Sequence, residues 1–168
     1  DMDGAAGGWW LRADPVHLRP DRDTLFFVGP VADLSVAEAG HLVGELDPVF
    51  LPRGWHLYMG HPARWYLRLP EDPQMRTCMP SEVAGRDVRG LLPFGPHGAL
   101  WHVLMNEVQM QLHMSEVNRQ RQARGAAEVN SLWFWGGGPA PRLTGGWTAM
   151  WCDDVLGCAL ARAAVDRA

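Results

Sequence analysis

Arginine offers the clearest candidate chemistry in this sequence. All fifteen basic residues are Arg and none is Lys, which excludes Schiff-base catalysis and a Walker-type lysine. The stretch "RQRQAR" places Arg119, Arg121 and Arg124 within six residues. Three guanidinium groups at this spacing suit either a bidentate clamp for phosphate or carboxylate, or a solvated helix face.

Other candidate chemistries lack the patterns that they require. The seven histidines include no HExxH motif, and the pairs His56/His61 and His97/His102 do not share one helical face at a metal-ligand spacing. No GxSxG motif is present, and no cysteine has an adjacent base. The sequence therefore predicts no metal site, no cofactor and no catalytic residue.

Three further motifs have structural interpretations. The stretch "GGGPAP" follows a predicted strand, as phosphate-binding loops do, but Pro139 and Pro141 disfavour the helix that such a loop needs. We interpret it as a tight turn at a sheet edge. The acidic "DMDG" falls within a predicted flexible tail, residues 1–8. Asp153 or Asp154 is expected to cap a final helix, with an acid/base pair as the alternative.

Length and composition indicate one globular domain, residues 9–168. The chain has 168 residues, of which 47% are hydrophobic and 20% charged. No apolar run reaches the roughly 18 residues of a membrane span, and the net charge of -4 argues against general nucleic-acid binding. The chain begins at Asp1 rather than Met, so a missing targeting segment says little.

The three cysteines do not suggest a disulfide framework. Cys78, Cys152 and Cys158 are odd in number and lack CxxC spacing. We interpret them as buried free thiols in a reducing compartment and expect a cytoplasmic protein.

The first half of the chain shows strand and helix signals. Residues 16–19 and 24–28 form the arms of a predicted β-hairpin around "PDRD". Ser35 and Glu38 have capping-box spacing and begin a helix that we expect to stop at Pro48. The apolar residues of this helix recur at helical period; they are Val36, Ala39, Val43 and Leu46.

The second half adds two strands, two helices and a further strand. Residues 55–69 suggest a strand pair around "GHP", and 70–96 suggest a long loop with one short strand. A helix is predicted over 98–113 with Trp101, Leu104, Val108 and Leu112 on one face. A second helix begins at the N-cap Ser115 and ends before Gly125.

The C-terminal signals complete an α+β domain. "EVNSLWFW" predicts a strand that ends at Gly136, and 145–154 predicts another before a helix through about Val165. We expect one domain with a mixed, mostly antiparallel sheet and helices mainly on one face. Trp133, Phe134 and Trp135 alternate across this sheet, so at least one ring belongs to the core, and stacking on a ligand is the alternative for the others.

One long stretch, "MSEVNRQRQARGAAEVNSLWFWGGGPAP", resembles the archaeal-type 2,3-bisphosphoglycerate-independent phosphoglycerate mutases. Those enzymes carry HPVN-x-x-R, a glycine, and an Asn-x-x-Trp strand that ends in a Gly-rich turn. The counterparts here are Val117, Asn118, Arg121, Gly125, Asn130, Trp133, Trp135, Gly136, Gly138 and Pro139. Ser115 and Glu116 replace the family's His-Pro.

The resemblance extends over some 150 residues of the family's insert domain. "ADPVHLR" places Arg19, and "HPARWYLRL" places Arg64, at arginine positions of the family. The resemblance implies an anion site formed by Arg19, Arg64, Arg121 and Asn118, which we expect to converge in one cleft. The catalytic core of these enzymes carries two divalent metals and a phosphorylated Ser, and none of those motifs is visible here.

These departures favour a protein that is not an enzyme as this chain. A bacterial group called phosphoglycerate mutase-like, or regulator of pathogenicity factors E, is also similar. The first hypothesis is a regulatory or small-anion-binding module that binds a phosphorylated small acid or a protein partner, and neither nucleic acid nor membrane. The second is a fragment or subunit of a working mutase. The third is a scaffold without a ligand.

Overall fold

A computed structural model describes residues 8–140, 151, 157–159 and 161 of the chain. In this part of the chain a five-stranded sheet packs against a layer of helices, which confirms the α+β prediction. Every described strand pairing is antiparallel. Within the predicted final helix, the described residues 157–159 and 161 are helical. The rest of that helix, its Asp153 or Asp154 cap, Cys152, the predicted strand at 145–154 apart from Trp151, and residues 1–7 of the predicted tail lie outside the described residues.

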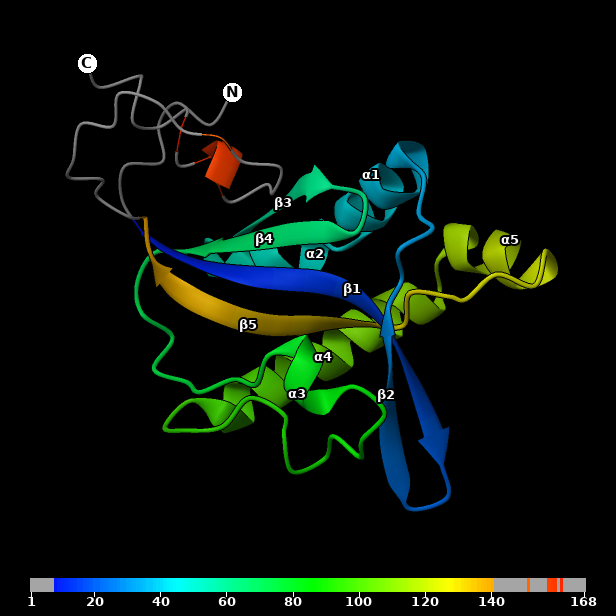
Figure 1. The fold of residues 1–168 in the computed structure, drawn as a ribbon, viewed down its shortest axis with the longest axis horizontal. Coiled ribbons are helices and arrows are strands. Elements are labelled where there is room, and N and C mark those ends of the chain that lie inside the picture. Colours follow the sequence, from blue (N-terminus) through cyan, green and yellow to red (C-terminus); the bar gives the residue numbers. More distant parts are fainter. Residues whose placement is uncertain (1–7, 141–150, 152–156, 160, 162–168) are drawn as a thin grey trace.

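The long strand β1 (Trp9–Asp21) organises the sheet. Its first half lies between β4 (Arg64–Leu69) and β5 (Ser131–Pro139), and its second half forms a hairpin with β2 (Thr24–Pro30). The hairpin projects from the end of the sheet (Figure 1). The hairpin prediction is confirmed, although β1 begins well before the predicted arm because it also pairs with β4 and β5.

The predicted strand pair at residues 55–69 is also confirmed. Strand β3 (His56–His61) pairs with β4, and Pro62 and Ala63 form the turn between them. The indole Nε1 of Trp65 donates a hydrogen bond to the carbonyl oxygen of Pro62 at 2.8 Å, which fixes this turn against the core.

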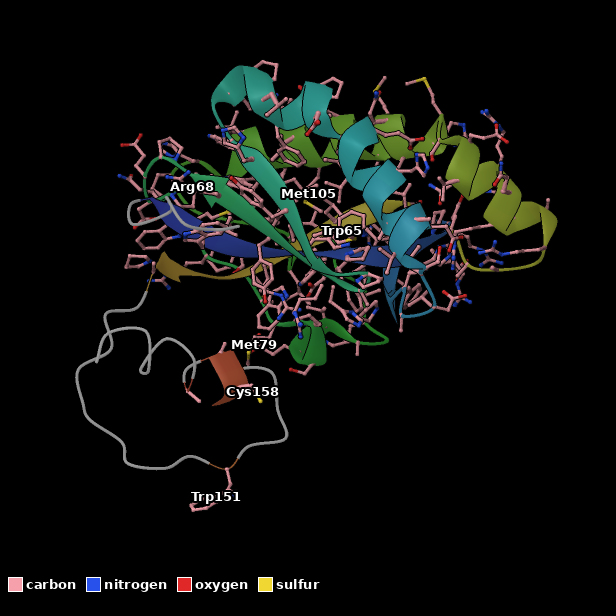
Figure 2. All side chains as sticks on the ribbon, turned by 90° about the horizontal axis from the view of Figure 1, so that it is seen from above. Trp65, Arg68, Met79, Met105, Trp151 and Cys158 are labelled. Atoms are coloured by element: carbon pink, nitrogen blue, oxygen red, sulfur yellow. The ribbon has the colours of Figure 1, made fainter. Side chains whose placement is uncertain are left out.

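Helices lie mainly on one face of the sheet, as predicted. They are α1 (Val36–Glu45), α2 (Asp47–Phe50) with the 3-10 turn η1 (Leu51–Arg53), α4 (Gly98–His113) and α5 (Glu116–Ala123). The four-residue α3 (Pro80–Val83) lies on the opposite side (Figure 2). Trp65 of β4 and Met105 of α4 meet in the main core between sheet and helices (Figure 2).

Helix α1 begins as predicted, and its buried face is confirmed for Ala39 and Leu46, which are fully buried, and for Val43, which packs against the core. Ser35 and Glu38 form the reciprocal capping box. Leu42 is fully buried, whereas Val36 in the first turn is 65% exposed. The helix ends at Glu45, before Pro48, and Pro48 lies in the first turn of α2. Proline is tolerated there because the N–H of that position has no intrahelical partner.

The prediction of a short strand within residues 70–96 is wrong for the described structure. This segment contains α3 and two isolated bridges, Arg76 with Phe94 and Phe26 with Asp87. Pro80 starts the helical turn, and Val83 packs beneath the sheet with Trp133. Cys78 is a free thiol, as is Cys158, but both are half-buried rather than buried.

The Gly-rich segment belongs to a strand, contrary to the prediction that β5 ends at Gly136. Gly138 pairs with Trp10 and Pro139 with Trp9, so the strand continues through the glycines. Gly136 has φ +64, and the register of β1 against β5 shifts beside it. A Cβ on Gly137 would lie 2.6 Å from Leu11 Cδ2 and 2.8 Å from Trp9 Nε1. The glycines therefore permit a bulge and close side-chain packing.

Substituting Gly137 by Ala is expected to destabilise the protein by about 1–3 kcal/mol, because Leu11 and Trp9 must both shift. Gly138→Ala is the matched control, since nothing lies within 4 Å of a Cβ at that position. Urea unfolding of both variants measures the difference. Equal destabilisation of the two variants would show that close packing against Leu11 does not require glycine at position 137.

Candidate functional site

Arg121, one of the predicted anion-binding residues, is fully buried and engaged with the protein itself. Its Nε donates to the carbonyl oxygen of Ala127 at 2.7 Å, and Nη1 donates to Glu38 at 3.1 Å. Its Nη2 forms an ion pair with Asp33. This guanidinium connects the start of α1 to α5 and to the segment that leads into β5. Its three partners give it a structural role.

Glu38 is the acidic centre of this network. Its carboxylate accepts hydrogen bonds from Ser35, Arg121 and Arg124. Burial raises the pKa of Glu38, but the bonds from Ser35, and then those from Arg124 and Arg121, outweigh it and lower the pKa to about 2. The carboxylate therefore stays charged in the folded protein well below the pH at which it would be protonated in the unfolded chain.

This pKa predicts a loss of stability in acid. The folded pKa lies below the unfolded value of 4.5, so the contribution of Glu38 is complete above about pH 4.5 and is lost as the pH falls towards 2. The urea midpoint of the wild type is expected to fall more steeply across this window than that of Glu38→Gln. If the urea midpoints of the two proteins fell in parallel with pH, the contribution of the Glu38 carboxylate to stability would be ruled out.

Asn118, the second predicted site residue on α5, is also fully engaged in hydrogen bonds within the protein. Its Nδ2 donates to the carbonyl oxygens of Leu112 at 2.8 Å and Val129 at 2.7 Å, and its Oδ1 accepts from the N–H of Val129 at 2.9 Å. The side chain of Asn130 bonds in the same way to both backbone groups of Leu18. The two asparagines thus join α4, β5 and β1.

The structure does not bring the predicted arginines together in one cleft. Arg121 lies on the helix side of the sheet, where it contacts α1. Arg64 alternates along β4 with the core residue Trp65, so it faces the opposite side. Arg19 is exposed on the projecting hairpin, where it pairs with Phe26. Sequence motifs could not show this, because they do not specify on which side of the sheet each residue lies.

The side of the sheet opposite the main helices carries a different group of polar and aromatic residues. We call this surface the open face, and define it by Trp10, Arg12 and Asp14 of β1, His56 and Tyr58 of β3, Arg64, Tyr66 and Arg68 of β4, and Trp135 of β5. In the pairing register Trp10, Arg68 and His56 form one cross-strand row, and Trp135, Arg12, Tyr66 and Tyr58 form the next. Arg64 precedes Tyr66 by two residues and lies on the same face.

Arg12 is held rigidly at the centre of the open face. It binds the buried carboxylate of Asp14 through Nε at 3.1 Å and Nη2 at 2.8 Å. Its guanidinium carbon lies 5.4 Å from the ring centroid of Tyr66 and 4.9 Å from that of Trp135. Trp135 in turn donates through Nε1 to Asp14 at 2.8 Å. Asp14 therefore neutralises the charge of Arg12.

Arg64 is the arginine of this face that is most available to a ligand. It is half-buried, and its Nε is buried without a hydrogen-bond partner in the described part of the chain. A buried N–H without a partner carries a desolvation cost, which an incoming anion would remove. Arg12 and Arg68 were missed as candidates, although "RWYLRL" alternates polar and apolar residues and so places both β4 arginines on one side.

One groove on the described surface lies apart from these arginines. A groove of about 660 Å³ lies between the hairpin and α4 and is lined mainly by apolar and amide side chains, among them Leu18, Met110 and Gln109.

Among the described residues no group of three or more His, Cys, Asp or Glu side chains is placed to hold a metal ion. No helix in the described ranges is long and apolar enough to cross a membrane.

The open antiparallel sheet, helix layer and arginine-bearing face define an α+β module with a candidate anion-binding surface. No protein-family model matches the chain. A probable 2,3-bisphosphoglycerate-independent phosphoglycerate mutase of Geobacter sulfurreducens is 30% identical over 136 residues, which cover 79% of this chain and 34% of that protein. The 2,3-bisphosphoglycerate-independent phosphoglycerate mutase of Methanosarcina barkeri is 28% identical over 150 residues, covering 85% and 37%.

A solved structure shows the same fold. The cofactor-independent phosphoglycerate mutase from Thermoplasma acidophilum matches with a TM-score of 0.58 at 17% identity, over 82% of this chain and 38% of that one. The chain is therefore homologous to part of the phosphoglycerate mutase family, consistent with the expected resemblance to the insert domain. It spans about a third of the length of the curated relatives that it matches.

Proposed function

We propose that this chain is a small-anion-binding module, derived from the mutase insert domain, that acts in regulation and not in catalysis. The supporting observation is Arg64, whose buried Nε lacks a partner on the open face of the sheet. A phosphorylated small acid offers two anionic groups, and a guanidinium binds either group through paired N–H donors. The relatives are named phosphoglycerate mutases, which makes a phosphoglycerate the first ligand to test.

The proposal assigns different roles to the arginines that the sequence grouped together. Arg64 binds the anion, Arg68 adds positive charge on the same strand, and Arg12 with Asp14 holds the rings of Tyr66 and Trp135 in place. Arg121 stabilises the fold, and Arg19 stands on the hairpin apart from this group.

A thermal shift with 3-phosphoglycerate tests the proposal. A ligand that binds only the native state stabilises it by about 2.7 kcal/mol at one hundred times its Kd, so the Tm must rise. Arg64→Gln is expected to abolish the rise, and Arg19→Gln on the exposed hairpin is expected to retain it. A wild-type protein whose Tm does not respond would favour a scaffold without a ligand. Loss of the response in Arg19→Gln alone would move the site to the hairpin.

A second candidate function follows from the length of the relatives. Since the chain spans about a third of them, it would also suit the substrate-clamping part of a working mutase whose metal centre lies on other residues. An assay for conversion of 3-phosphoglycerate to 2-phosphoglycerate, with Mn²⁺ added, distinguishes the candidates when it is run on the whole natural gene product. Turnover that Arg64→Gln reduces would establish the mutase and reject the regulatory module.

A further inference from the structure

The open face carries aromatic rings that a small phosphorylated acid would not need. Trp10 and Tyr58 belong to neighbouring cross-strand rows, and their rings lie side by side. The ring centroids are 5.5 Å apart, and the ring planes are tilted by 42°. The imidazole of His56 lies 6.3 Å from Tyr58 on the same strand. Both large rings are half-buried. Part of each ring surface is therefore exposed next to the positively charged residues of β4.

The pairing register fixes how far these rings lie from Arg64. Tyr58 is paired with Tyr66, and Arg64 precedes Tyr66 by two residues on the same side of β4. Two strand residues span about 7 Å, so Tyr58 lies one row from Arg64, a distance that a ribose and its phosphate ester can bridge. Trp10 is paired with Arg68 and lies one row further from Arg64. A planar base stacked on Tyr58, with Trp10 beside it on the side away from Arg64, would therefore position a 5′-phosphate at Arg64.

The charge of the face supports the same ligand. The chain has a net charge of -4, which argues against general nucleic-acid binding, but its charges are unevenly distributed. The open face holds Arg12, Arg64 and Arg68, and its carboxylate, Asp14, is already bound to Arg12. Antiparallel sheets with exposed aromatic rings bind bases by stacking, and nearby arginines contact the phosphate.

We infer that the open face binds a nucleotide, with its base stacked on Trp10 and Tyr58 and its phosphate on Arg64. This inference extends the proposed function, because it shares the phosphate contact at Arg64 and adds a second subsite for a planar ring. The same chemistry is present in a free mononucleotide and in one unit of a single-stranded nucleic acid.

Isothermal titration with 5′-AMP and with ribose 5-phosphate isolates the base subsite. Stacking on one base predicts that 5′-AMP binds the wild type about tenfold more tightly than ribose 5-phosphate, which is about 1.4 kcal/mol. Tyr58→Leu keeps an apolar side chain but removes the ring, and Trp10→Ala removes the other ring. Each is expected to reduce the ratio towards one, whereas Trp10→Phe should preserve most of it. Arg64→Gln is expected to weaken both ligands.

The results separate this inference from the proposed function. If 3-phosphoglycerate binds through Arg64 but 5′-AMP and ribose 5-phosphate bind the wild type equally, the base subsite does not exist and the proposed function stands. If the ratio is unchanged in Tyr58→Leu, with native circular dichroism, the inference is overturned as well. A deoxyadenosine decamer that binds much more tightly than 5′-AMP, with a strong dependence on salt, would identify a single strand as the source.

Discussion

Substitution of Arg121 by Met is expected to lower the free energy of unfolding by about 3 kcal/mol, because it removes one partner of a buried ionic network. The guanidinium has no exposed surface, and it satisfies the carbonyl oxygen of Ala127, Glu38 and Asp33 together. Methionine fills much of the volume of the Arg121 side chain but leaves the carbonyl oxygen of Ala127 without a hydrogen-bond donor. Asp33 is 64% exposed and can be hydrated, which keeps the loss near the lower end of the usual range for such breaks.

Urea unfolding of three variants tests this role. Arg121→Lys retains the charge but cannot reach three acceptors with the planar fork of Arg, so an intermediate loss is expected. Arg119→Met is the matched control on the same helix, because Arg119 is 61% exposed and its bonds to Glu116 and to the carbonyl oxygen of Met114 lie at the surface. A change below about 1 kcal/mol is expected there. If Arg121→Met matched this control, Arg121 would be free to serve a ligand.

Substitution of Asn118 by Leu is expected to cost about 3 kcal/mol as well. Leucine has a similar size but cannot satisfy the carbonyl oxygens of Leu112 and Val129 or the N–H of Val129. Val129 is fully buried, so water cannot replace these bonds without opening the structure. Buried backbone groups left unpaired cost about 1–3 kcal/mol each, and partial relaxation reduces the sum.

Asn106→Leu on α4 is the control, because Asn106 is exposed at the groove beside the hairpin. Its effect is expected to stay within about 0.5 kcal/mol. Hydrogen exchange adds a second measurement: the N–H of Val129 should lose protection in Asn118→Leu. Retained protection at that amide would contradict the hydrogen-bonding role of the Asn118 side chain.

These two predictions change the meaning of the motif that carries the family resemblance. Asn118 and Arg121 were predicted to bind an anion, and Asn130 belongs to the same motif, yet all three hold elements of the fold together. A motif in a single sequence does not distinguish a residue needed for the fold from one needed for a ligand. Arg and Asn are suited to both roles, since each has several donors in a fixed geometry.

Local signals in the sequence determined most of the elements. Ser35 with Glu38 fixed the start of α1, and the apolar period of residues 98–113 predicted α4 with its buried Trp101, Leu104, Val108 and Leu112. Ser115 and Gly125 marked the ends of α5. Such signals depend on neighbours within one or two helical turns, so the chain itself specifies them.

Only the tertiary structure decided which side chains share a surface. The alternation in "RWYLRL" separates Arg64 from Trp65, but the packing of α1 and α4 determines which of the two sides is covered. The pairing of β1 with both β4 and β5 brings Arg12, Tyr66 and Trp135 together from distant positions in the chain. The same pairing extends β5 through its glycines, because Gly137 allows Leu11 and Trp9 to pack closely. Long-range register and close packing of this kind have no local signature in the sequence.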